Sequence, residues 1–334
     1  MGQVSSEMTD LTSSRGIKRN KVTTKDQYVT LQARGAYVAT VSQPEAAFDL
    51  SAVAQVTNPQ KGDIEKLNKH LDWQTNNATR GLQFVPLNLA ADSLQLLVFT
   101  DSSFANNPNH SSQIGYVIVL TDKHDNANIL HWSSTKCKHI TRSVLALKLY
   151  GMAHGFDTGA SIKNTIELIL KIDNLPLMLC TDSKSLYECL VKLGTIQEKY
   201  LMINNLCLRQ AYERRLITKI IWIDGTTNPA DAMTKSKPCQ GLKDLIDTNK
   251  INIKLTGWVE RGNDEEKSVP HQGLKNKESP VCVQLYNNIY PFPLSQVVPL
   301  SPTDPATDPC QNTERSDQPD CGAQPAHANQ TPAR

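Results

Sequence analysis

The chain has 334 residues, 39% of them hydrophobic, and its 35 basic and 33 acidic side chains leave a formal charge of +2. This length allows one or two domains with buried cores, and the near-neutral balance excludes a polycation whose whole surface binds nucleic acid. The eight cysteines include no C-x-x-C pair, which indicates free thiols in a reducing compartment. With no secretory signal and no apolar run of transmembrane length, we expect a cytoplasmic or nuclear protein without a membrane partner.

Residues 1–26 are polar and rich in Ser, Thr and Lys, which predicts a disordered N-terminal segment. From residue 27 the pattern changes to two apolar helical stretches that are separated near Pro44. The following stretch "GDIEKLNKHLDWQTNN" is amphipathic with helical spacing. Residues 27–93 are therefore predicted to form a small helical unit.

Residues 94–255 alternate between strand and helix patterns. Strands are predicted at 95–100, 114–121, 128–133, 177–181 and 217–223, and helices at 143–157, 184–192, 196–213 and 239–247. Three consecutive strands followed by alternating helices and strands predict an α/β fold with a mixed five-stranded sheet and flanking helices. After residue 261 the chain holds eleven of its 18 prolines among Ser, Thr, Gln and Asp, so residues 261–334 are predicted to be a disordered tail.

Two of the apolar runs end on the same three residues, Thr-Asp-Ser, at Asp101 and at Asp182. A strand buried on both faces reads as a continuous hydrophobic run, so both segments are typical of strands inside one sheet. If the strands are neighbours, the two carboxylates lie side by side and repel each other unless a cation such as Mg²⁺ lies between them. Asp231, just after Asn228-Pro229, is a third candidate at the start of a helix. Turn formation and helix capping remain the alternative roles for these aspartates.

At these residues the chain resembles the ribonuclease H domain of copia-type LTR retrotransposons. The resemblance is carried by "FTDSSFAN", "HWSSTKCKHITRSVLALKLYGMAHGFD", "LCTDSKSLYECL" and "NPADAMTK". Upstream, "QARGAYVATVSQPEAAFDLSAVAQ" and "DIEKLNKHLDWQ" resemble the terminal part of a retrotransposon reverse transcriptase, without the paired aspartates of its polymerase motif. The resemblance covers residues 27 to 260. It implies a fragment of a Pol polyprotein with a ribonuclease H-like fold.

Ribonucleases H cleave RNA in RNA–DNA hybrids with Mg²⁺ or Mn²⁺ ions held by four carboxylates. The resemblance places three of these carboxylates at Asp101, Asp182 and Asp231. The remaining position, a glutamate in the family, is Lys148 in "SVLALKLY". A lysine has three donors and no acceptor, so it cannot bind a metal ion as an ammonium. We therefore expect metal binding to be impaired and hybrid cleavage to be weak or absent.

A basic cluster, Lys136, Lys138 and Arg142, surrounds the third strand and the following helix. It is predicted either to contact the phosphates of a hybrid or to form a solvated face. Trp73 is expected in a core or domain contact, with base stacking as the alternative. The implied partners are an RNA–DNA hybrid or other nucleic acid and the rest of a retrotransposon reverse transcriptase. Two other functions stay open: non-catalytic nucleic-acid binding, and a protein-interaction remnant of a transposon polyprotein.

Overall fold

The computed structural model describes residues 23–90, 93–107, 109–191 and 201–260. Most of the predicted N-terminal segment and the whole predicted tail lie outside these residues. The helices are α1 (Thr24–Val41), α2 (Ala47–Val53), α3 (Lys61–Asn76), α4 (Val144–Leu170), α5 (Lys184–Val191), α6 (Leu201–Glu213) and α7 (Gln240–Thr248), with the short 3-10 helices η1 (Pro44–Ala46), η2 (Gly225–Thr227) and η3 (Pro229–Met233). The strands are β1 (Gln95–Ser103), β2 (Gln113–Thr121), β3 (Ala127–Lys136), β4 (Leu177–Thr181), β5 (Lys219–Ile223) and β6 (Leu255–Glu260).

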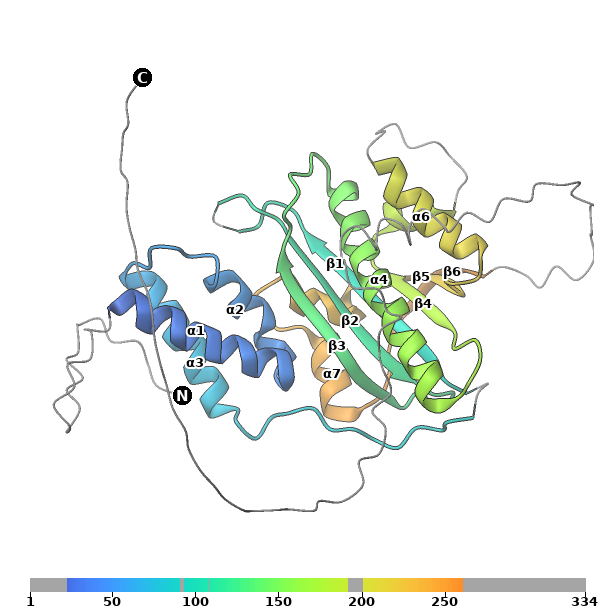
Figure 1. Ribbon diagram of the computed structural model, residues 1–334, viewed down its shortest axis with the longest axis horizontal. Coiled ribbons are helices and arrows are strands. Elements are labelled where there is room, and N and C mark those ends of the chain that lie inside the picture. Colours follow the sequence, from blue (N-terminus) through green and yellow to red (C-terminus); the bar gives the residue numbers. More distant parts are fainter. Residues whose placement is uncertain (1–22, 91–92, 108, 192–200, 261–334) are drawn as a thin grey trace, which may run out of the picture. The chain divides into compact units, whose positions relative to one another are not determined.

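The strands form one mixed sheet in the order β3-β2-β1-β4-β5-β6 (Figure 1). The first three strands pair antiparallel, β1, β4 and β5 pair parallel, and β6 closes the far edge antiparallel to β5. The predicted mixed α/β sheet is thus confirmed, but the predicted number of five strands is wrong. The sequence of β6, "LTGWVE", is short and contains a glycine, so it has only a weak strand pattern and depends on pairing with β5.

Each face of the sheet has its own hydrophobic core. Alternate residues of β1, such as Leu96 and Val98, pack with α4, α5 and α6, whereas Leu97 and Phe99 pack with η3 and α7. This double burial explains why β1 reads as a continuous apolar run. Because helices cover both faces of the sheet, polar side chains can cluster at the ends of β1 and β4.

Helix α4 is longer than predicted and lies unusually close to β1. Gly155 and Gly159 face the strand, and an added Cβ would lie 2.9 Å from Thr100 Cγ2 and 2.7 Å from Val98 Cγ2, respectively. These glycines suggest a helix end in the sequence because glycine has a low helix propensity. In the fold they permit the close approach that brings α4 against the site.

The helical unit α1–α3 has its own core and is tied to the sheet by specific hydrogen bonds. Trp132 of β3 donates from Nε1 to the carbonyl oxygen of Ala39 at 2.9 Å. Arg80 bridges Glu45 at 2.6 Å and Asp247 of α7 at 2.8 Å. The unit is therefore packed against β3 and α7 by contacts that are far apart in the sequence.

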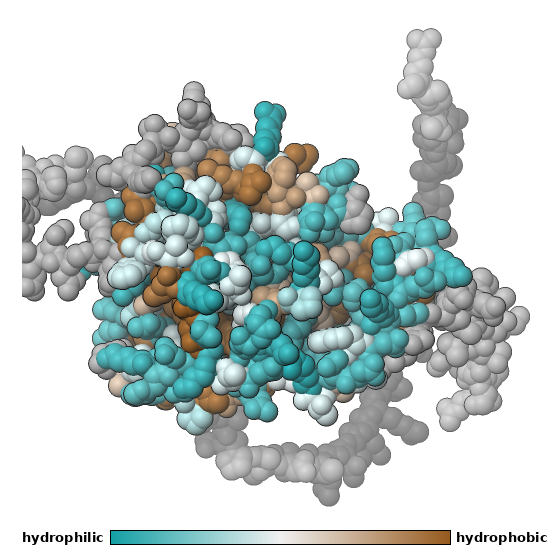
Figure 2. Space-filling model, turned by 180° about the vertical axis from the view of Figure 1, so that it is seen from behind, coloured by the Kyte–Doolittle hydropathy of each residue, from teal (hydrophilic) through white to brown (hydrophobic). Residues whose placement is uncertain are grey.

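The face seen in Figure 2 is mostly hydrophilic, with smaller hydrophobic patches between the polar side chains. Among the described helices, none combines the length and the apolar character needed to cross a membrane.

Candidate active site

The sheet register places Asp101 and Asp182 next to each other. Asp101 lies in β1 and Asp182 directly follows β4, and these parallel strands pair with Thr100 opposite Thr181. The next residue along each strand is therefore an aspartate at the same edge. The Asp101 side chain is 1% exposed and that of Asp182 is 16% exposed, so the repeated Thr-Asp-Ser motif creates a partly buried carboxylate pair.

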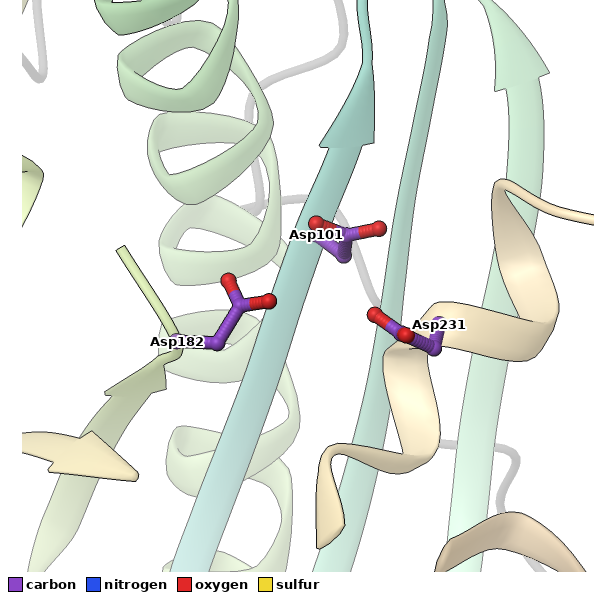
Figure 3. Close-up of side chains that lie close together, drawn as sticks. All are labelled: Asp101, Asp182 and Asp231. Carbon is purple, nitrogen blue, oxygen red and sulfur yellow. The ribbon is translucent and has the colours of Figure 1, made fainter. Parts of the chain in front are cut away.

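Asp231 reaches the same place from η3, on the other side of β1. Asn228 caps η3 by accepting a hydrogen bond from the backbone N–H of Ala230, and its side-chain amide donates to the carbonyl oxygen of Thr100 at 3.3 Å. This contact holds the start of η3 beside the residue that precedes Asp101. One carboxylate oxygen from each of the three aspartates lies within 4.8 Å of the others, and the side chains point toward one another (Figure 3).

Lys148 joins this cluster from α4. Its Nζ donates to Asp101 Oδ1 at 3.1 Å and to Asp182 Oδ1 at 2.9 Å, and its side chain is only 17% exposed. The helix presents Lys148 to the sheet because the partly buried Leu145 and the buried Met152, which pack on the core, lie on the same helical stripe. The ammonium therefore lies between the two carboxylates that the strands bring together.

A second lysine, Lys235, was not predicted from the sequence, and it contacts Asp101 and Asp231. Lys235 Nζ lies 2.8 Å from Asp231 Oδ2 and 3.4 Å from Asp101 Oδ2, and the Thr234 hydroxyl also donates to Asp101 Oδ2. The i, i+4 spacing of Asp231 and Lys235 is a signal for an ion pair on a helical turn. Only the fold, however, brings Lys235 to Asp101.

The charges of the cluster nearly balance, since three carboxylates face two ammonium groups. Burial alone would raise the pKa of Asp101, but the positive charges of Lys148 and Lys235 outweigh it and lower this pKa. Burial would likewise lower the pKa of Lys148, but Asp101 and Asp182 raise it, so the ammonium stays protonated. The cluster has one more negative charge than positive charges, and this excess affects Asp231 most. Burial and the neighbouring Asp101 raise the pKa of Asp231 to about 6 despite the contact with Lys235.

This arrangement does not fit the pair of divalent ions that a ribonuclease H site holds. Mg²⁺ requires about six oxygen ligands in a compact octahedron. Here, both Oδ atoms of Asp101 and one oxygen of Asp182 already accept hydrogen bonds from N–H or O–H donors. Asp231 Oδ1 is buried without a hydrogen-bond partner among the described residues, so it is not engaged by either lysine. The carboxylate triad is present, but the lysines take the positions where cations would be held.

The predicted basic cluster is not part of this network of hydrogen bonds and ion pairs. Lys136 ends β3, and Lys138 and Arg142 lie in the segment before α4; all three side chains are exposed. Within the described part of the chain, none of them has a hydrogen bond or ion pair with the three aspartates. Their role in contacting nucleic acid stays a prediction.

Comparison with known proteins places the chain beside ribonucleases H at low identity. No protein-family model and no curated protein matches the sequence. Among solved structures, ribonuclease H1 from Halobacterium salinarum is 15% identical, with coverage of 45% of this chain and 98% of that chain and a TM-score of 0.33. LC11 ribonuclease H1 in complex with an RNA/DNA hybrid is 16% identical over 44% of this chain and 99% of that chain, with a TM-score of 0.32. The protease-reverse transcriptase of prototype foamy virus is 16% identical over 51% of this chain and 22% of that chain, with a TM-score of 0.28.

These overall likenesses are low, so the fold assignment rests on the strand order and the flanking helices described above. In those features the predicted ribonuclease H-like fold class is confirmed, with a sixth strand added.

Proposed function

We propose that this chain carries a ribonuclease H-like domain of retrotransposon origin in which cleavage of RNA–DNA hybrids is suppressed. The observation that carries the proposal is the position of Lys148 Nζ, 3.1 Å from Asp101 and 2.9 Å from Asp182. In the resembled family a glutamate stands at this position. Exchange of a carboxylate for an ammonium removes a ligand and adds a competing cation at the same point.

The lysines attract the aspartates strongly enough to compete with a divalent ion. Two unit charges about 3 Å apart attract each other by roughly 5 kcal/mol at an effective dielectric constant near 20. A divalent ion would have to displace Lys148 from two such contacts and Lys235 from one or two more. The tethered ammonium groups therefore oppose metal binding without any loss of the fold.

The retrotransposon origin is supported by the four sequence segments that resemble copia-type elements and by the helical unit that precedes the sheet. We propose that residues 27–93 correspond to the end of a reverse transcriptase and residues 94–255 to the ribonuclease H-like domain, with β6 continuing to residue 260. On this proposal the ancestral partners are an RNA–DNA hybrid and the rest of the reverse transcriptase. The ancestral cofactor is Mg²⁺ or Mn²⁺.

The test is hybrid cleavage and metal binding by the unmodified chain. The protein is incubated with a labelled RNA–DNA hybrid and Mg²⁺ or Mn²⁺, next to an active ribonuclease H and an Asp101→Asn variant, while Mg²⁺ binding is measured by calorimetry. We expect no cleavage above the Asp101→Asn background and no measurable heat of binding. Metal-dependent cleavage that disappears in Asp101→Asn would contradict the proposal.

A further inference from the structure

A cavity of about 680 Å³ lies between the helical unit and the segment that joins η3 to α7. Residues of η1, α2 and α3 line one side, and residues between Ala232 and Lys243 line the other. Its volume lies within the range of small-molecule sites. Lys235 belongs to this lining, so the cavity adjoins the carboxylate cluster without being part of it.

The cavity carries an excess of positive charge. Its two acidic side chains are already engaged: Glu45 with Arg80 at 2.6 Å, and Asp49 with Ser236 at 2.8 Å and His70 at 3.4 Å. Three further lysines line the cavity without such compensation.

These lysines are Lys69, Lys237 and Lys243. Each side chain is exposed, and none has a hydrogen bond or ion pair with another residue in the described ranges. Lys243 also lies in the first turn of α7. Three unpaired ammonium groups around one concave surface are the electrostatic complement of a phosphate.

An aromatic side chain faces the same space. Trp73 lies one helical turn after Lys69 on α3, lines the cavity and is 37% exposed, so it does not serve as an ordinary core residue. An indole face beside lysines is the combination with which proteins bind single-stranded nucleic acid, because bases stack on the ring and ammonium groups hold the backbone.

We propose that this cavity binds a short stretch of single-stranded nucleic acid, with a base on Trp73 and neighbouring phosphates held by Lys69, Lys237 and Lys243. The site goes beyond the proposed function, because its binding does not depend on whether the carboxylate cluster holds a metal ion. A strand is favoured over a free nucleotide because the lysines come from both sides of the cavity, on α3 and around the start of α7, and so can follow a chain of phosphates.

The experiment measures fluorescence anisotropy of a short labelled oligodeoxythymidylate with the full-length chain in EDTA, so that metal-dependent events are excluded. Trp73→Leu should weaken binding about 5- to 150-fold, while Trp73→Phe should retain most of it. The double variant Lys69→Ala/Lys243→Ala should weaken binding and lower the slope of log affinity against log salt by roughly 1.4, since about 0.7 is expected for each lost contact with a single strand. The matched control is Lys61→Ala/Lys66→Ala, which removes two exposed lysines of α3 outside the cavity and should leave affinity nearly unchanged.

Competition with adenosine monophosphate, inorganic phosphate and an oligoglutamate peptide identifies the ligand. Displacement of the oligonucleotide only at much higher mononucleotide concentration supports a strand, and equal affinity supports the same base-and-phosphate site with a free nucleotide as its ligand. Three results would overturn the proposal: no oligonucleotide binding, equal weakening by the control variant, or oligoglutamate binding as tight as that of the oligonucleotide. None of these results bears on hybrid cleavage, so the failure of this site and the failure of the proposed function can be distinguished.

Discussion

Replacement of Lys148 by glutamate changes the charge of the carboxylate cluster by two units. With three aspartates and two lysines the cluster carries a net charge of about −1, and Lys148→Glu takes it to about −3. Two attractive contacts of Lys148, at 3.1 Å and 2.9 Å, become repulsive ones. Because the removal of one partner from a buried ion pair costs about 3–5 kcal/mol, the metal-free variant should be less stable than the wild type.

The same change should create a binding site for a divalent ion, which stabilises the folded state through mass action. A metal concentration one hundred times the dissociation constant contributes about 2.7 kcal/mol of stability. The melting temperature of Lys148→Glu should therefore be lowered in EDTA and should rise with Mg²⁺ or Mn²⁺, while that of the wild type should not respond. Weak, metal-dependent cleavage of an RNA–DNA hybrid should appear together with this stabilisation.

Two controls separate the added ligand from the lost charge. Lys148→Met removes the ammonium and supplies no hard ligand, so it should bind metal less tightly than Lys148→Glu. Asp101→Asn in the Lys148→Glu background should abolish both the metal response and the cleavage. If Lys148→Glu folds but its melting temperature responds to metal no more than that of Lys148→Met, the reasoning from charge and ligands is refuted.

Three further predictions concern the stability of the domain. Burial opposes ionisation of Asp122, but four N–H groups donate to its carboxylate and hold its pKa at about 2. Its contribution should be present above the ordinary value of 3.8 and be lost as the pH falls toward 2, so chemical unfolding should show the wild type losing its advantage over Asp122→Asn in that window. Gly159→Val should lower the free energy of unfolding by about 1–3 kcal/mol because even a Cβ would lie 2.7 Å from Val98 Cγ2; an unchanged stability would show that α4 can shift outward. Removal of residues 261–334 should leave the melting temperature unchanged, since proline-rich polar sequence buries little apolar area, and a large drop in a thermal scan would contradict this.

The sequence by itself was sufficient to locate the aspartates of the cluster. Asp101 and Asp182 each end an apolar run, and the equivalent edges of neighbouring parallel strands coincide in any such sheet. Lys148 could also be placed, because its helical spacing from Leu145 and Met152 turns it toward the sheet. These are local patterns, in which a period of 2 or 3.6 residues determines the side to which a residue points.

The contacts that those residues make with one another depend on the tertiary structure. Thr234 and Lys235 reach Asp101 across more than a hundred residues of chain, through the packing of η3 against β1, and no local pattern encodes that contact. The strand β6 likewise has too weak a pattern to be predicted and forms because β5 offers an unpaired edge. Trp73 has the sequence context of a core residue, yet the packing of α3 beside the segment before α7 leaves it facing a cavity lined by lysines. In each case the deciding contact joins segments distant in the chain, and its free energy depends on distances that only the folded chain sets.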